Sequence, residues 1–276
     1  MRTLLAFWAV ALMAAPAPAQ EVEPRCDRPL IVREGQGVVG LDLALDLSHG
    51  RAGRRIEVGS FHPADHRDGL SLAVGVSKGF EFGAALQLVW HQSRTTPYNY
   101  GNGTEFGGFY AYGVWAFLPY LGVEVGLQAP SKAGWERLRV RRVTLQYAMP
   151  FQTTLIPGRL AVRLRPDLLV GFAQKYYDGD QGPPQYSVFA EAGLTFNWTR
   201  EFFVDLSVGA GKVLKGRDLD VQGLIAPGRS VFVPLSLQVG YSVTDALDLS
   251  LAWTFPDVRG LRGDGRFLTF SAEYRY

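Results

Sequence analysis

Apolar and polar residues alternate along most of this chain, which is the period-two pattern of β-strands. In residues 267–276 every second side chain is apolar up to the final Tyr276, and the residues between them include Glu273 and Arg275. A strand with one bare apolar face would promote aggregation at the edge of a soluble sheet. In a transmembrane barrel that face meets lipid, the other face meets the lumen, and the last strand pairs with the first.

The same alternation predicts about twelve strands after residue 37. They are expected at 38–48, 70–76, 80–91, 107–117, 121–128, 138–147, 160–172, 188–198, 202–208, 231–241, 247–255 and 267–276. Aromatic residues fall on both parities of 107–117, so the pattern does not assign its faces. The alternation slips near Arg141 and Arg142, which indicates a β-bulge. Pro166 indicates a further distortion because it cannot donate a ladder hydrogen bond.

The connections between these strands alternate in length. Long polar loops follow the odd-numbered strands, at 49–69, 93–105, 129–137, 175–185, 213–229 and 257–265. The even-numbered strands end mostly in short turns, and 149–158 is the one longer turn on that side. A soluble β-sandwich would have no reason to keep this parity. The pattern therefore predicts an all-β fold, a single transmembrane antiparallel up-and-down β-barrel of about twelve strands.

The N-terminus departs from the strand pattern. Arg2, an apolar run over 4–15 and the sequence Ala17-Pro18-Ala19 predict a cleaved signal peptide over 1–19. Residues 20–37 are rich in charge and proline, and we expect either a mobile arm on the periplasmic side or a small plug inside the lumen. The barrel itself is expected over 38–276. Cys26, the single cysteine, does not fit a lipoprotein cleavage site, and we expect a free thiol.

The last strand also carries a terminal motif, Tyr274-x-Tyr276. It resembles the C-terminal recognition signal of bacterial outer-membrane barrels, in which aromatic residues occupy the last and third-last positions. The resemblance implies export to the outer membrane, contact with its lipid and lipopolysaccharide, and insertion by the barrel-assembly machinery, with Tyr274 and Tyr276 as the assembly signal. By pattern the mature chain is similar to the porin and small outer-membrane protein group, but no motif names a substrate.

Composition adds two constraints to this picture. The chain has 28 Lys and Arg residues against 26 Asp and Glu residues, and this near balance argues against a nucleic-acid partner. Aromatic residues make up 13% of the chain, which suits a barrel with rings at the membrane interfaces. Twelve lysines and arginines of the predicted loops could contact lipopolysaccharide phosphates, or could simply keep the loop surface solvated.

The polar faces of the predicted strands carry the candidate lumen-lining residues. These are Asp42, Asp46, Glu81, Glu124, Arg163, Arg165, Asp167, Glu191, Asp205, Asp248, Glu273 and Arg275. Their excess of carboxylates predicts a water-filled channel that favours cations. The alternative is a lumen crossed by arginine–carboxylate pairs that bind its walls together and leave no continuous pore.

Enzymatic or metal chemistry has weak support in the sequence. His49, His62, His66 and His91 all fall in the first long loop or at the external end of a strand, and we interpret them as solvated rim residues rather than metal ligands. His91-Gln92-Ser93 is the nearest fragment to a hydrolase site, but nothing in the sequence places an orienting third residue. We predict no catalytic residue, metal or cofactor.

The leading functional hypothesis is a passive, porin-like channel for small hydrophilic solutes. The first alternative is a non-conducting barrel that anchors, adheres or stabilises the envelope. The second is a hydrolase at the rim of the barrel. The sequence does not predict the oligomeric state.

Overall fold

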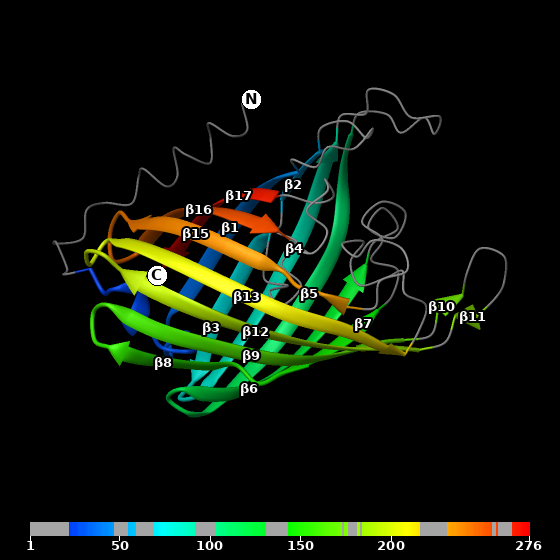
Figure 1. The fold of residues 1–276 in the computed structure, drawn as a ribbon, viewed down its shortest axis with the longest axis horizontal. Coiled ribbons are helices and arrows are strands. Elements are labelled where there is room, and N and C mark those ends of the chain that lie inside the picture. Colours follow the sequence, from blue (N-terminus) through cyan, green and yellow to red (C-terminus); the bar gives the residue numbers. More distant parts are fainter. Residues whose placement is uncertain are drawn as a thin grey trace.

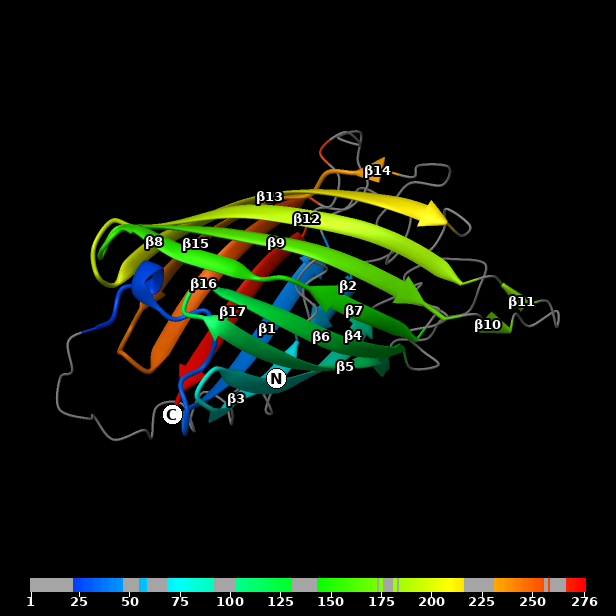
Figure 2. The same cartoon turned by 90° about the horizontal axis from the view of Figure 1, so that it is seen from below.

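The computed structural model describes residues 22–46, 55–58, 69–91, 103–130, 143–172, 174–175, 181–182, 184–215, 231–255, 258 and 267–276. The expected signal peptide and most of the long loops lie outside these residues. Within them the chain forms an antiparallel β-barrel, in which the strands run between an end with short turns and an end with long connections (Figures 1 and 2).

The barrel is closed and has twelve strand positions, as the pattern predicts. Nine positions hold one strand each: β1 (Gly37–Asp46), β4 (Phe80–His91), β5 (Gly103–Leu118), β6 (Leu121–Pro130), β9 (Leu160–Gly171), β12 (Gln185–Asn197), β13 (Phe202–Lys215), β16 (Leu247–Phe255) and β17 (Phe267–Arg275). Three positions are split into two segments: β2 (Arg55–Val58) with β3 (Leu70–Ser77), β7 (Thr144–Ala148) with β8 (Phe151–Ile156), and β14 (Val231–Phe232) with β15 (Leu235–Ser242).

The first and last strands form the seam of the barrel. β1 and β17 pair in continuous register from Val38 opposite Arg275 to Asp46 opposite Phe267. The pairing extends to the final residue, because Gly37 N–H donates to the Tyr276 carbonyl at 2.9 Å and Tyr276 N–H donates to the Gly37 carbonyl at 3.0 Å. The edge that the last strand would expose alone is therefore fully paired.

The split positions correct the sequence-based boundaries. Phe151–Ile156 was expected as part of a turn, but it forms β8 and pairs with β9. Pro150, which has no N–H, separates β7 from β8, and Pro234 lies between β14 and β15 in the same way. Opposite the first break lies Pro166, whose carbonyl accepts a hydrogen bond from Met149 N–H at 3.0 Å. The prolines thus interrupt pairing locally without opening the barrel.

Other segments expected as loops are also strands. β2 lies within the predicted first loop and pairs with β1 and β4. β13 continues to Lys215, beyond its expected end at residue 208. A short hairpin with two residues in each strand, β10 (Gln174–Lys175) and β11 (Gln181–Gly182), lies beyond the ends of β9 and β12 (Figure 1). The predicted bulge at Arg141 and Arg142 lies outside the described residues.

The outward face of the barrel is apolar. In β5 the structure assigns the faces that the pattern left open: Tyr110, Tyr112 and Val114 are buried inside, whereas Trp115 and Phe117 are exposed outside. Aromatic residues gather at the turn end, where they include Phe80, Trp115, Phe117, Tyr120, Phe196, Trp198, Phe202, Tyr241, Tyr274 and Tyr276. This arrangement matches the aromatic girdle of a transmembrane barrel at one membrane interface. No helix in the described part of the chain is long and apolar enough to cross a membrane.

Inside the barrel, aromatic rings pack closely against glycines of neighbouring strands. A Cβ added to Gly240 would lie 2.1 Å from the Phe203 ring, and one added to Gly83 would lie 2.3 Å from the Tyr112 ring. Phe232 covers Gly211 in the same manner, whereas Tyr276 covers Gly37 on the outer face of the seam. The glycines allow large rings to pack against the wall rather than project into the lumen.

This packing predicts the effect of a methyl group at Gly240. Gly240→Ala should destabilise the barrel by about 1–3 kcal/mol, because the Phe203 ring has to move in a packed interior. The measurement is urea-induced unfolding of the barrel in lipid vesicles. Gly193→Ala is the matched control, since its nearest neighbour is the flexible Arg163 side chain at 3.3 Å. Equal stability of the two variants would contradict the ring-on-glycine account.

Candidate functional site: the barrel lumen

The described part of the N-terminal arm, residues 22–36, lies inside the barrel at the turn end (Figure 2). It contains the one-turn 3₁₀ helix η1 (Arg25–Asp27) and then extends towards β1. Its hydrogen bonds reach β4, β8, β12 and β16, which lie on different sides of the barrel. The arm therefore crosses the opening instead of following one wall.

Main-chain groups of the arm are held by polar side chains of the wall. Cys26 N–H donates to Asn197 Oδ1 at 3.0 Å, and the Cys26 carbonyl accepts from Thr154 Oγ1 at 2.9 Å. Farther along, Val32 N–H donates to Glu81 Oε2 at 2.7 Å. These bonds satisfy backbone groups that would otherwise be buried without partners. They also leave the Cys26 side chain fully buried.

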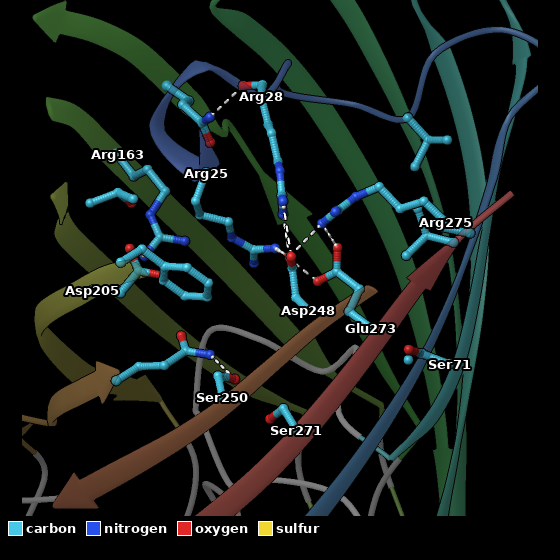
Figure 3. Close-up of a pocket in the computed structure, with 18 of the residues that line it drawn as sticks. Arg25, Arg28, Ser71, Arg163, Asp205, Asp248, Ser250, Ser271, Glu273 and Arg275 are labelled. Carbon is cyan, nitrogen blue, oxygen red and sulfur yellow. Dashed lines mark hydrogen bonds and ion pairs between the residues drawn. The ribbon is translucent and has the colours of Figure 1, made fainter. Parts of the chain in front are cut away.

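Asp248 of β16 is the centre of the charged contacts between arm and wall. Arg28 binds its carboxylate with both terminal nitrogens, and Nη2 lies 3.0 Å from Oδ1. Arg25 Nη1 lies 3.2 Å from Asp248 Oδ2 and 3.0 Å from Glu273 Oε2. Arg275 of β17 contacts both Asp248 and Glu273. Figure 3 shows the three guanidinium groups converging on this pair of carboxylates.

Burial and neighbouring carboxylates change the pKa values of three side chains of the arm. Burial alone would lower the pKa of Arg25, but the carboxylates of Glu273, Asp248 and Asp205 more than offset this and hold that pKa above its ordinary value. Burial lowers the pKa of Arg28. Burial and the nearby Asp27 carboxylate raise the pKa of the Cys26 thiol to about 11, so the thiol is protonated at neutral pH.

A second polar network lines β5, β6, β7 and β9. The Tyr110 hydroxyl lies 2.8 Å from Glu124 Oε1 and 2.9 Å from Gln146 Oε1. Arg165 reaches Glu124 at 3.0 Å and Asp167 at 3.2 Å. These strands are neighbours or next neighbours in the barrel, so the described ion pairs of this network run along the wall and do not cross the lumen.

A cavity of about 420 Å³ remains between the arm and the wall, and its lining residues come from β1, β3, β4, β5, β8, β9, β12, β13, β15, β16 and β17. Seven carboxylates and five arginines line it; one carboxylate, Glu23, and three of the arginines, Arg25, Arg28 and Arg33, come from the arm. Most of the remaining side chains on β15, β16 and β17 that face it are small and polar, and they comprise Ser236, Gln238, Ser250, Thr254, Thr269 and Ser271. The open part of the interior therefore has a hydrophilic and mildly acidic surface.

The structure distributes the sequence-predicted residues over these features. The cavity is lined by Asp42, Glu81, Arg163, Glu191, Asp205, Asp248, Glu273 and Arg275. The second network holds Glu124, Arg165 and Asp167. The side chain of Asp46 is outside the described part of the structure, whereas Tyr274 and Tyr276 are exposed on the outer face.

Several residues of this site were not anticipated from the sequence. Arg25 and Arg28 fell in a segment whose position was open, and Asn197, Gln146 and Tyr110 have neutral side chains that a search for charges passes over. The one signal available in the sequence was the polar character of positions such as Asn197 on the inward parity of its strand.

The candidates for other chemistry lie mostly outside the described residues. His49, His62, His66, Gln92 and Ser93 are not among them, nor is the side chain of His91. Among the residues that the structure does describe, no group of three or more histidine, cysteine or acidic side chains could hold a metal ion.

Comparison with known proteins identifies the fold. No protein-family model matches the chain, and a search of curated proteins finds no match. Among solved structures, the COG4313 outer membrane channel from Pseudomonas putida F1 is similar with a TM-score of 0.56 at 11% identity, over 93% of this chain and 100% of that chain. The KdgM porin, solved in complex with disordered oligogalacturonate, gives a TM-score of 0.48 at 10% identity, over 86% of this chain and 98% of that chain.

By its fold the chain is a closed antiparallel β-barrel of the kind seen in bacterial outer-membrane proteins, as the strand pattern predicts. Its outward apolar face and aromatic girdle fit that membrane. Within this class it is a twelve-strand barrel with a polar interior.

The contacts at Asp248 predict how the arm is retained. Asp248→Asn removes the carboxylate that Arg28 and Arg25 of the arm share, while Arg25 keeps its contact with Glu273, and breaking a buried ion pair costs ~3–5 kcal/mol. If about 1.4 kcal/mol of this cost favours the released state of the arm, the released population rises about tenfold. The rate at which a maleimide labels Cys26 should then rise by at least the same factor. The matched control is Glu201→Gln in the β12–β13 turn, which should label at the wild-type rate. Equal labelling of both variants would mean that Asp248 does not hold the arm.

Proposed function

We propose that the barrel is a passive channel for small hydrophilic solutes, with a weak preference for cations. The observation that carries this proposal is the polar cavity that remains along β13, β15, β16, β17, β1 and β3. Most of the uncharged side chains that face the cavity from β15, β16 and β17 are small and polar, so water and solutes can follow that part of the wall. The bulky network of Tyr110, Glu124 and Arg165 lies against β5, β6 and β9.

The charge balance supports the cation preference. Of the residues that line the cavity, the barrel wall contributes six carboxylates and two arginines, Arg163 and Arg275. The arm adds three arginines and one carboxylate, which brings the lining to seven carboxylates against five arginines. Carboxylates in excess raise the local concentration of cations. The arm thus reduces both the width and the negative charge of the path.

In this proposal the chain has three parts. Residues 1–19 are a signal peptide removed on export, 20–37 form an arm that inserts into the lumen, and 38–276 form the barrel. Outer-membrane lipid and lipopolysaccharide surround the barrel, and the assembly machinery recognises the strand that ends in Tyr274 and Tyr276.

The contacts of the arm also favour a second candidate, a non-conducting barrel that stabilises the envelope. The arm has partners on β4, β8, β12 and β16, and a permanent position there would narrow the turn end. The two candidates differ in one respect, whether the arm leaves a continuous aqueous path. The rim-hydrolase hypothesis gains no observation in its favour from the described residues, and no catalytic residue is proposed.

Planar-bilayer recording of the refolded protein tests the channel. Conductance steps should appear in 1 M KCl, and Asp42→Lys should lower the cation-to-anion permeability ratio about twofold because Asp42 lines the cavity. Glu201→Lys makes the same charge change in a turn residue outside the cavity lining and should leave the ratio unchanged. Absence of conductance steps from both the wild type and Asp248→Asn would contradict the channel and favour the structural barrel.

The role of Tyr276 in assembly has its own test. Tyr276→Asp should reduce the amount of folded protein in the outer membrane of cells several-fold, as judged by heat-modifiable migration in gels. Tyr241→Asp is the matched control, because Tyr241 is also an exposed aromatic at the turn end but does not terminate the chain. An equal loss in the two variants would assign the effect to the lipid-facing ring rather than to a terminal signal.

A further inference from the structure

The wall of the cavity presents a set of groups suited to a guanidinium ion. Both terminal nitrogens of Arg28 donate to the carboxylate of Asp248, which is the bidentate geometry in which carboxylates bind the planar guanidinium group. Arg25 lies between Asp248 and Glu273, and its Cζ is 5.5 Å from the centre of the Phe203 ring. Carboxylates on one side and an aromatic face on another are the contacts that distinguish guanidinium from a compact ammonium.

The guanidinium groups of Arg25 and Arg28 come from the arm, whereas Asp248, Glu273 and Phe203 belong to the wall. The arm contains no strand of the barrel, so its contacts are not required for closing the sheet. The wall therefore forms a site for guanidinium groups, and in this structure the site is occupied by arginines of the N-terminal arm of the same chain.

Asp205 provides an independent observation in the same cavity. Its side chain is 4% exposed, and neither of its carboxylate oxygens accepts a hydrogen bond. The nearest cation, Arg163 Nη2, lies 3.7 Å from Oδ1, which is long for a bonded pair. A buried carboxylate without hydrogen bonds is costly, and this one lies in the cavity across Arg25 from Asp248 (Figure 3). The wall thus carries more negative charge than the arm satisfies.

We propose that Asp248, Glu273, Asp205 and Phe203 form a binding site for solutes that carry a guanidinium group, and that Arg25 and Arg28 occupy this site as tethered competitors. A solute that binds there displaces the two arginines, and the arm is released from the lumen. Binding and release are then linked, because the arm and the solute exclude each other from the same carboxylates. The proposal deepens the channel function and rests on it in one respect, since solutes must reach the lumen.

The single cysteine of the chain gives a direct readout of arm release. Cys26 is fully buried while the arm is in place, so a maleimide reagent can react with it only when the arm moves. Three probes with the same n-butyl chain separate charge from shape: n-butylguanidinium, n-butylammonium and the neutral n-butylurea. The full-length folded protein in detergent micelles is labelled with each at 10 mM and at constant ionic strength.

We expect n-butylguanidinium to raise the labelling rate at least fivefold, n-butylammonium to raise it less, and n-butylurea to leave it unchanged. Asp205→Asn should weaken the response to n-butylguanidinium, because Asp205 is one of the carboxylates of the proposed site and lies in the cavity beside Arg25. Glu201→Gln should alter neither the basal labelling rate nor this response. Equal responses to all three probes would overturn the proposal.

A second measurement does not depend on arm movement. In Arg25→Ala/Arg28→Ala the competitors are gone, and isothermal titration calorimetry should detect saturable binding of n-butylguanidinium that weakens at least tenfold when Asp248→Asn is added. No binding to the double variant would also overturn the proposal. Neither experiment measures current, so the site and the channel are tested separately. A barrel that binds n-butylguanidinium but conducts no ions would contradict the channel and leave the site standing. A barrel that conducts ions but does not bind n-butylguanidinium would contradict the site and leave the channel standing.

Discussion

The structure depends on one constraint, that no backbone N–H or C=O group can face lipid without a partner. The barrel meets it by pairing every strand position on both sides, and the seam between β1 and β17 completes the ring. Pairing reaches the last residue through the two hydrogen bonds between Gly37 and Tyr276. Pro150 and Pro234 lie where this constraint tolerates them, between β7 and β8 and between β14 and β15. Closure also fixes which face of each strand meets lipid.

Once the faces are fixed, the interior has to accommodate charge. Wall arginines pair with carboxylates on nearby strands, as Arg165 does with Glu124, and these pairs run along the wall. The carboxylates of Asp248 and Glu273 are neutralised partly by Arg275 and partly by the arm. Buried pairs of this kind contribute little net stability but are strongly disrupted when one partner is removed. Their main consequence is to position the arm.

The sequence predicted the features that follow from local periodicity. Alternation in 267–276 and in the other strands was sufficient for the class of fold, the strand number and the parity of the inward charges. It failed where pairing depends on a partner far along the chain: β8 follows Pro150 and reads as a turn, yet β9 supplies its hydrogen bonds. Local periodicity also could not predict the position of the arm, because the contact of Arg28 with Asp248 joins residues 220 positions apart. The glycines beneath Tyr112 and Phe203 could not be assigned for the same reason.

The central claim is that the lumen is a polar path which the arm narrows. It is tested most directly by comparing the single-channel conductance of a chain that begins at residue 20 with that of a chain that begins at residue 34, in the same bilayer and salt. Removing the arm takes Arg25 and Arg28 out of the cavity and leaves the wall carboxylates in place. The account predicts a conductance several-fold higher and a stronger preference for cations in the shortened chain. An unchanged conductance and selectivity would contradict it.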